Sequence, residues 1–260
     1  MTVRAGFLPI ISSYSIMQFP RNVTRLCGNK CFSFRCHPNV PCFTECCREL
    51  ELALTPYDVL CLCKELQMSS EEFIDRYAVV EQDATGGFPK VYLGMVDDGR
   101  ASCPFIGTNG CTVYNGRPGA CRAYPVGRGA TLDGNGDVHE IHVLVCEEHC
   151  KGFAEPHSQN VGEWFENQGL TEYNRINDEV LTLLQHEKIR KGMRLAQEQI
   201  DNFMLSLYKV DEFRKVVAAP DSLPGLQLDD RELADILEDD TTLLRFGIHW
   251  LKETLMADKE

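Results

Sequence analysis

The 260-residue sequence predicts an α+β fold, in which an irregular, cysteine-rich half with short helices and strands precedes a mainly helical C-terminal region. All 13 cysteines lie between Cys27 and Cys150. Turn-forming residues surround many of these cysteines, whereas apolar residues recur at helical spacing near the C-terminus. We therefore expect a cysteine-cluster metal-binding domain at residues 1–155 and an acidic helical region, packed on it, at residues 156–260.

Local signals place several elements in the first half. Thr55 to Asp58 reads as an N-cap, a proline at the first helical position and an acidic first turn, which predicts a helix from Pro56 to about Leu66. A capping box from Ser69 to Glu72 opens a second short helix through Tyr77. Residues 90–96 and 138–145 read as strands, and the second follows a turn rich in Gly, Asn and Asp at residues 133–137.

The second half reads as helical. Asp229 and Glu232 form an acidic analogue of the capping box ahead of a further helix. Apolar stripes at helical spacing predict the others, and most such stripes pack in a core, although one could form a docking face for a partner. The stripes comprise Tyr173, Ile176, Val180, Leu183 and Leu184, then Met193, Ala196, Ile200, Phe203 and Leu207, and finally Leu244, Leu251 and Leu255.

Composition and charge exclude several classes of protein. With 43% hydrophobic and 25% charged residues the chain is not disordered, and a formal net charge of −13 argues against nucleic acid or an anionic membrane surface as a partner. The excess of acidic over basic residues is larger after residue 150, where the chain has 22 acidic and 13 basic residues. We expect a redox or protein partner to use this acidic tail.

The ends of the chain and its cysteine count indicate a compartment. The apolar stretch from Phe7 to Met17 contains Pro9 and lacks the three-part pattern of a signal peptide, and no apolar run approaches the ~20 residues of a membrane span. We therefore expect a cytoplasmic protein, in which thiols stay reduced. An odd number of cysteines also argues against a full set of disulfides.

The cysteines fall into groups that suit metal coordination. The spacings are Cys-x5-Cys-x3-Cys-Cys, then Cys-x7-Cys-x9-Cys, and then Cys-x3-Cys. Thiolates are soft ligands for zinc, Cu(I) or iron–sulfur clusters, and each such site takes about four of them. Two four-ligand sites, adjacent or merged into one centre, would be filled by Cys36, Cys42, Cys46, Cys47, Cys103, Cys111, Cys121 and Cys150.

Spacing favours one metal over another. Zinc ribbons use Cys-x2-Cys, which is absent here, whereas iron–sulfur clusters accept irregular spacing from distant segments. We therefore favour an iron–sulfur cluster of the 4Fe–4S type, with zinc as the alternative. Arg117 and Arg122 follow the second cysteine group and are predicted to hydrogen-bond metal-bound sulfur.

Other candidates have simpler explanations. Cys61 and Cys63 lie two apart on a predicted helix, cannot share a face, and are expected to be buried apolar side chains. Cys27 and Cys31 are either accessory ligands or uncoordinated thiols, and the role of Cys146 is open. Histidines near the cysteines, among them His149, are more often ordinary polar residues than ligands.

Two stretches carry a resemblance to a known family. The cysteines from Cys36 to Cys47, and the run C-P-F-I from Cys103 with C-x-V-Y-x-x-R-P-x-x-C-R-x-Y-P from Cys111, are similar to the YkgJ-type cysteine-cluster family. This resemblance covers roughly residues 36–152 and ends at a Cys-x-Gly element. It implies a zinc- or iron-chelating, or iron–sulfur-containing, domain. The first cluster departs from the family's tighter Cys-x2-Cys-x2-Cys-Cys pattern.

Three functions remain open. The first is an iron–sulfur protein for electron transfer or redox sensing, and the second is a structural zinc module acting in protein–protein interaction. The third is a metal-dependent enzyme, an oxidoreductase or a protein-modifying enzyme, because flagellin lysine methylases resemble the same family. A radical-SAM motif, Cys-x3-Cys-x2-Cys, is absent, since Glu49 and Phe34 stand at the third positions.

Overall fold

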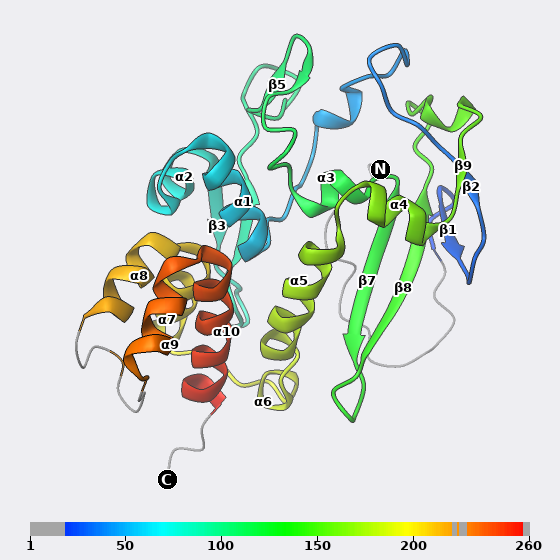
Figure 1. Ribbon diagram of the computed structural model, residues 1–260. Coiled ribbons are helices and arrows are strands. Elements are labelled where there is room, and N and C mark those ends of the chain that lie inside the picture. The colour runs from blue at the N-terminus through cyan, green and yellow to red at the C-terminus, as the bar shows by residue number, and fades with distance from the viewer. Residues whose placement is uncertain (1–18, 220–222, 224–227, 257–260) are drawn as a thin grey trace. The chain divides into compact units, whose positions relative to one another are not determined.

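The computed structural model describes residues 19–219, 223 and 228–256 (Figure 1). The stretch from Phe7 to Met17 lies outside the described residues. The chain divides into two compact units, each built from two segments: unit 1 is Met1–Ala53 with Leu93–Arg175, and unit 2 is Leu54–Tyr92 with Ile176–Glu260. The α+β class is confirmed. The division at residue 155 stays a prediction, and each unit contains residues from both sides of it.

Unit 1 consists of short strands, short helices and long loops. Its strands are β1 (Val23–Leu26), β2 (Phe32–Ser33), β5 (Ile106–Gly107), β6 (Gly110–Cys111), β7 (Val126–Leu132), β8 (Val138–Val145) and β9 (Ser158–Gln159). Its helices are the 3-10 turns η1 (Glu45–Cys47) and η2 (Gly152–Ala154), together with α3 (Gly119–Ala123), α4 (Val161–Asn167) and the start of α5 (Thr171–Leu184).

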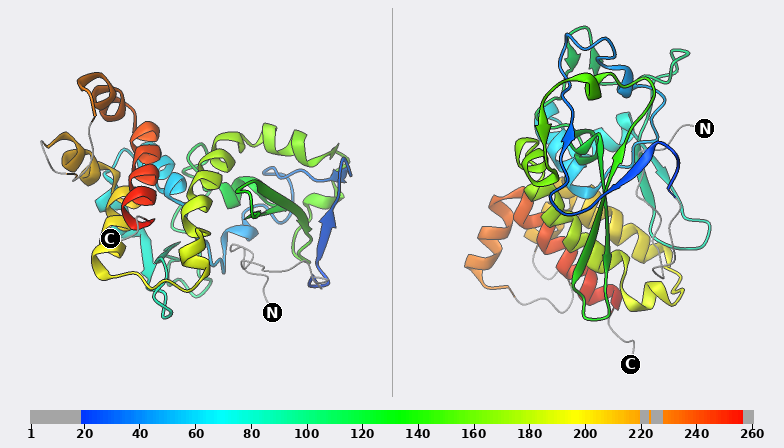
Figure 2. Two further views of the ribbon diagram at one scale, coloured as in Figure 1. Left: turned by 90° about the horizontal axis from the view of Figure 1, so that it is seen from below. Right: turned by 90° about the vertical axis from the view of Figure 1, so that its right-hand side faces the viewer.

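The largest sheet of unit 1 has three antiparallel strands in the order β1-β8-β7. The predicted strand 138–145 is confirmed as β8, and its partner β7 joins it through the predicted turn, where Leu132 pairs with Val138. The Asp133 carboxylate holds this turn by accepting from the backbone N–H groups of Asn135 (2.8 Å) and Asp137 (2.9 Å). Figure 2 shows β7 and β8 as the two arms of one long hairpin, and β1 pairs with the C-terminal half of β8.

The core of unit 1 is aromatic. Phe34 is 2% exposed and lies edge-on to Trp164 (ring centroids 5.6 Å apart) and to Tyr124 (6.1 Å). The Trp164 indole N–H donates to the carbonyl of Ala123 (2.8 Å), which ties α4 to the end of α3. Cys150 packs against the same cluster, so one predicted ligand is anchored on the core.

Unit 2 is mainly helical. Its helices are α1 (Pro56–Leu66), α2 (Ser70–Tyr77), the end of α5, α6 (Glu187–Arg190), α7 (Gln197–Tyr208), α8 (Val210–Ala218), α9 (Asp230–Glu238) and α10 (Asp240–Met256). Its strands β3 (Ala78–Glu81) and β4 (Lys90–Leu93) form a small sheet. The predicted strand at 90–96 is shorter than expected, because Val96 leaves the ladder and makes an isolated bridge to Ser102.

Caps explain where these helices begin. Thr55 and Asp58 form the predicted capping box of α1, and Asp229 with Glu232 forms that of α9. Ser69 caps α2 by accepting from the Glu72 N–H (3.2 Å). The predicted stripe from Met193 begins too early, since α7 starts only at Gln197.

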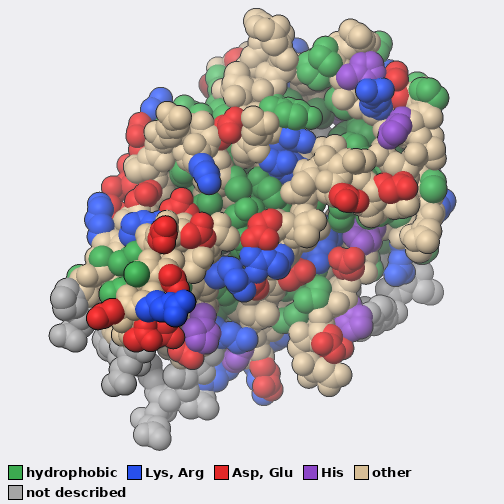
Figure 3. Space-filling model, viewed as in Figure 1, with side chains coloured by type: hydrophobic (Ala, Val, Ile, Leu, Met, Phe, Trp, Pro, Cys, Tyr) green, Lys and Arg blue, Asp and Glu red, His purple; other side chains and the backbone are tan. Residues whose placement is uncertain are grey.

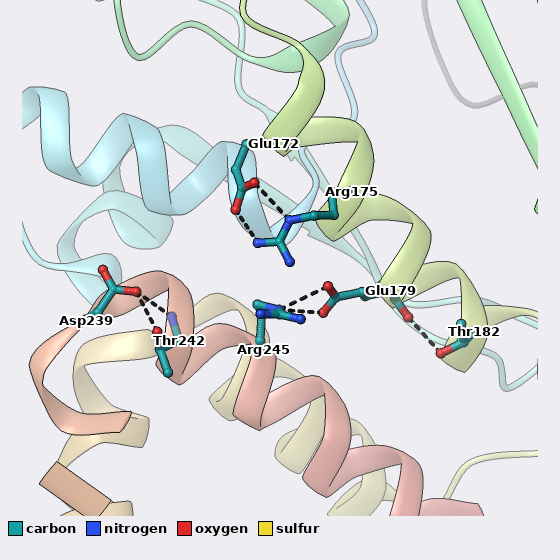
Figure 4. A network of polar contacts seen from close by, with 7 residues as sticks. All are labelled: Glu172, Arg175, Glu179, Thr182, Asp239, Thr242 and Arg245. Carbon is teal, nitrogen blue, oxygen red and sulfur yellow. Dashed lines mark hydrogen bonds and ion pairs between the residues drawn. The ribbon is translucent and has the colours of Figure 1, made fainter. Parts of the chain in front are cut away.

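Within unit 2, buried apolar residues hold the helices, and a partly exposed ion pair joins α5 to α10. Phe213 of α8 is fully buried and packs on Trp250 of α10 (ring centroids 5.6 Å apart). Figure 4 shows the Arg245 Nε pointing at both carboxylate oxygens of Glu179, at 3.0 and 2.9 Å. Acidic and basic side chains are interspersed over the face seen in Figure 3.

In the part of the chain that the structure describes, no helix combines the length and the apolar character that a membrane span requires.

Removing the cap of α1 should weaken the fold measurably. In Thr55→Ala the Asp58 N–H loses its acceptor, which stands at 3.3 Å, so we expect the free energy of unfolding to fall by about 1 kcal/mol. Urea unfolding followed by circular dichroism measures it. Glu65→Ala, an exposed change on the same helix, is the control and should stay within about 0.5 kcal/mol of the native chain. Equal stability of the two variants would contradict the role of the cap.

Candidate metal centre

The first cysteine group lies on a loop that curls tightly. Thr44 adopts a left-handed backbone (φ 69°), and η1 follows it immediately. Two backbone bonds close the curl: the Glu45 N–H donates to the Cys42 carbonyl and the Cys47 N–H to the Thr44 carbonyl, both at 3.0 Å. The Arg48 guanidinium donates to the Thr44 carbonyl (2.8 Å) and so clamps the turn that carries Cys46 and Cys47.

Backbone contacts join the first cysteine group to the second. The Cys103 N–H donates to the Cys47 carbonyl (2.8 Å), beside a bridge between Arg48 and Ser102. The β5–β6 hairpin then places Cys111 opposite Ile106. In this hairpin Gly110 has a φ of +112°, and a Cβ there would stand 3.0 Å from the ring of Phe43, which lies between Cys42 and Cys46. The first and second cysteine groups therefore lie close together because a backbone hydrogen bond joins them and because Gly110 has no side chain to keep Phe43 away.

The third cysteine group reaches the first through the turn at Cys150, Lys151 and Gly152. The Lys151 N–H donates to the Cys42 sulfur (3.0 Å). The Gly152 carbonyl accepts from the Arg35 N–H (3.1 Å), next to Cys36. A Cβ on Gly152 would lie 2.7 Å from the Phe34 ring and 2.8 Å from the Arg35 carbonyl, so only glycine fits. The glycine of the Cys-x-Gly element is therefore required because Phe34 and the Arg35 carbonyl leave no room for a side chain at residue 152.

These contacts bring cysteines from both ends of unit 1 together. The pKa of Cys36 is raised to about 11, first by burial of the thiol and then by the nearby Cys46, Cys42 and Cys150. The pKa of Cys150 is raised mainly by burial and also by the neighbouring Cys42. The pKa of Cys146 is raised mainly by burial and also by Cys150. A first group of thiols therefore gathers around Cys36, Cys42 and Cys150.

A second group of thiols adjoins the first at Cys46. The pKa of Cys46 is raised by its hydrogen bond with Cys47 and then by burial. Burial raises the pKa of Cys103, and the nearby Cys111 and Cys46 add to this effect. Cys121 lies on α3 and is linked to this group through Arg117, which is close to both Cys121 and Cys111. Seven of the eight predicted ligands thus lie near at least one other and form a network, and Cys121 lies at its edge, near Arg117.

Among the described residues, the cysteines of the network lie near one another but are not arranged as a coordination shell. All 13 cysteines lie in the described region and none forms a disulfide. Across residues 19–219, 223 and 228–256, no three His, Cys, Asp or Glu side chains are arranged to hold a metal ion as they stand. Six of the eight predicted ligands are half-buried, and Cys36 and Cys121 are exposed. The donor set is nevertheless all sulfur, which suits zinc or iron–sulfur clusters.

Arg117 and Arg122 brace the second group through hydrogen bonds to backbone carbonyls and to Gln168. Arg117 donates to the Tyr114 carbonyl and to the Gln168 side chain, both at 2.6 Å. Arg122 donates to the carbonyls of Arg117 (3.0 Å) and Gln168 (2.9 Å). Burial lowers the pKa of Arg117, and the neighbouring Cys121 and Cys111 oppose that shift. Their role as hydrogen-bond donors to a metal-bound sulfur stays a prediction.

The remaining cysteines differ in their surroundings. Cys61 and Cys63 belong to unit 2 and are half-buried, so they are less buried than predicted: both lie beside the buried stripe of α1. Cys27 and Cys31 are exposed, and the Cys31 thiol donates to the Asn29 carbonyl (3.7 Å). Cys146 is exposed and lies near Cys150, at the edge of the network.

The histidines nearest the cysteines have carboxylate partners. The Nε2 atom of His37 is 3.2 Å from Glu155 Oε2, and that of His149 is 3.6 Å from Glu147 Oε2. The expectation that these are ordinary polar residues fits these pairs.

Two residues beside the thiols were not singled out from the sequence. Tyr124 interacts with Cys150 and Glu147, and Glu147 also lies close to Cys46. The only signal for Tyr124 was its place in the C-R-x-Y-P stretch, and a single glutamate between two cysteines carries no signal at all.

The comparisons with known proteins agree with this geometry. Residues 35–151 match the family model CxxCxxCC, described as a putative zinc- or iron-chelating domain. The predicted resemblance to a cysteine-cluster family is therefore confirmed, and metal binding in general is supported. No curated protein and no solved structure gave a match.

The fit of Gly152 against Phe34 yields a testable consequence. In Gly152→Ala the new methyl group collides with the Arg35 carbonyl, so the turn must move and withdraw Cys150 from Cys42. We expect zinc affinity to fall about tenfold or more, as it does when groups supporting metal ligands are lost.

Competition with a chromophoric chelator measures this affinity. Gly134→Ala is the matched control, because a Cβ on Gly134 meets no atom within 4 Å. Equal affinities for the two variants would contradict the role given to the turn.

Proposed function

We propose that this chain, whose residues 35–151 form a domain of the zinc- or iron-chelating cysteine family, holds one or two iron–sulfur clusters through cysteine thiolates. The observation that supports the proposal is that seven of the eight predicted ligands, from separate segments, each lie near at least one other, while Cys121 lies near Arg117. The ligands would be Cys36, Cys42, Cys46, Cys47, Cys103, Cys111, Cys121 and Cys150. Irregular spacing and an adjacent cysteine pair favour a cluster over a single ion.

The proposed role is electron transfer or redox sensing in the cytoplasm. A bound cluster would supply one-electron chemistry at a potential set by burial, net charge and hydrogen bonds to sulfur. The chain's own residues would fix that potential: the Lys151 N–H already donates to the Cys42 sulfur, and Cys150 rests on the aromatic core. An acidic helical surface would then receive a redox or protein partner.

Zinc is the second candidate, and one observation favours it. The thiols form two groups that meet at Cys46, each with about the four donors that a tetrahedral zinc site requires. In that case the domain would be a structural module for protein–protein interaction. A metal-dependent enzyme remains a prediction.

Anaerobic purification, followed by assays of iron, zinc and acid-labile sulfide and by an optical spectrum, tests the proposal. Iron and sulfide in equal amounts, with broad absorption that dithionite bleaches, are the expected result. Stoichiometric zinc in a colourless protein would support the second candidate instead. Anaerobic handling matters because zinc can enter a site that has lost its cluster.

Cysteine variants identify the ligands. We expect Cys46→Ser to lose at least half of the bound metal, because Cys46 lies where the two thiol groups meet. Elemental analysis after anaerobic purification measures the loss. Cys61→Ser is the control, since that half-buried thiol belongs to unit 2, and it should keep the native metal content. Equal metal content in both variants would rule out the assignment.

Metal uptake should depend on pH in a defined direction. Burial raises the pKa of Cys36 to about 11 and raises that of Cys103, so both thiols stay protonated at neutral pH until a metal displaces the proton. The affinity for zinc should therefore rise with pH, by about tenfold per pH unit for each thiol deprotonated on binding. Titration between pH 6 and roughly pH 8 measures the slope. A pH-independent affinity would show that thiols are not the ligands.

A further inference from the structure

We infer that Tyr124 is a positioning residue of the metal centre, which donates its hydroxyl hydrogen to the Cys150 sulfur when that sulfur is a metal-bound thiolate. This inference rests on the proposed function, since it assigns a role to a side chain beside the proposed ligands.

The ring of Tyr124 is fixed from several sides. The residue follows α3 and precedes β7 (Figure 1), and its backbone N–H donates to the Ala120 carbonyl (3.1 Å). Phe34 lies edge-on to the ring at 6.1 Å, and the neighbouring Ala123 carbonyl is held by the indole of Trp164. The hydroxyl therefore has a set position on the core rather than swinging in solvent.

That hydroxyl is unsatisfied among the described residues. The Tyr124 hydroxyl oxygen is buried, and no described group meets the distance and angle of a hydrogen bond to it. The polar side chains nearest to it in effect are those of Cys150 and Glu147. A buried hydroxyl without a partner is costly, and a neutral thiol is a weak acceptor. A metal-bound sulfur carries more negative charge than a neutral thiol and accepts a stronger hydrogen bond, so the hydroxyl gains its partner once Cys150 is a ligand.

Other donors already converge on the same pair of sulfurs. The Lys151 N–H stands 3.0 Å from the Cys42 sulfur, and the Gly152 N–H interacts with the Cys150 sulfur. With Tyr124, three donors would surround two sulfurs. Such outer donors orient metal ligands and offset their charge. Packing alone does not explain the Tyr124 hydroxyl, because a phenylalanine ring would fill the space beside Phe34 equally well.

Glu147 competes for the same hydrogen. Its side chain is 20% exposed, lies 3.6 Å from His149, and also interacts with the Tyr124 hydroxyl. The hydroxyl has one hydrogen to give, so it bonds either the carboxylate or the sulfur. Neutralising the carboxylate should therefore direct the hydrogen to Cys150.

The test uses Co²⁺ as an optical probe of the whole chain, under anaerobic conditions. Tyr124→Phe keeps the ring and removes the hydroxyl, and Tyr92→Phe is the matched control because that tyrosine lies in β4 of unit 2. We expect Tyr124→Phe to bind Co²⁺ about tenfold more weakly. We also expect its thiolate-to-cobalt charge-transfer band to move to lower energy, since an unbonded sulfur is a better electron donor. Tyr92→Phe should match the native chain in both measurements.

A second variant keeps the test decisive if Tyr124→Phe folds poorly. Glu147→Gln leaves the hydroxyl in place and should move the charge-transfer band to higher energy, whereas a move to lower energy would overturn the inference. So would a Tyr124→Phe variant with native affinity and a native band. If the native chain itself binds no Co²⁺, the proposed function fails, which separates that failure from a failure of this inference.

Discussion

The proposed metal centre requires thiols from four separate stretches of chain to meet, and several contacts in unit 1 draw these stretches together. These stretches consist of loops and very short elements, which are η1 at Cys46 and Cys47, β6 at Cys111 and α3 at Cys121. Within the described residues, no long helix or extended sheet therefore holds them together. Single backbone contacts do so instead: the Cys103 N–H on the Cys47 carbonyl, and the Lys151 N–H on the Cys42 sulfur. In each contact the donor is a backbone N–H group.

The aromatic core gives these loops a rigid base. Phe34 touches the turn at Gly152 and the ring of Tyr124, and Cys150 packs on the same cluster. A thiol held against an apolar core is desolvated, which disfavours its ionised form. A cation or cluster that neutralises the thiolates reverses that balance, so metal binding and the folding of these loops are coupled. The same core that positions the ligands therefore makes the uncharged thiol the stable form in the absence of metal.

The sequence predicted local structure well and long-range structure poorly. The helix from Pro56 to Leu66 could be predicted from the sequence because the residues that start it, Thr55, Pro56 and Asp58, lie within a single helical turn. The strand β7 was not anticipated, since Val126–Leu132 contains two glycines and no alternation of apolar and polar residues. The discontinuous units were missed for a related reason: nothing in the order of residues shows that Leu54–Tyr92 folds with the C-terminal helices.

The ligand candidates could be named from the chemistry of cysteine, but their partners could not. Tyr124, Glu147 and Gly152 matter through contacts with residues far along the chain, and such contacts leave no periodic pattern. Arg117 and Arg122 were recognised as important near the cysteines, yet their hydrogen bonds go to carbonyls and Gln168. A guanidinium in a turn serves the backbone as readily as it serves an anionic sulfur.

X-ray absorption spectroscopy at the metal edge, on chain purified without oxygen, addresses the central claim most directly. The account predicts a first shell made of sulfur alone, at about 2.3 Å from the metal. A metal–metal scattering distance in the same spectrum would indicate a cluster, and its absence a single zinc ion. A first shell dominated by nitrogen or oxygen would contradict the claim that the converging thiols are the ligands.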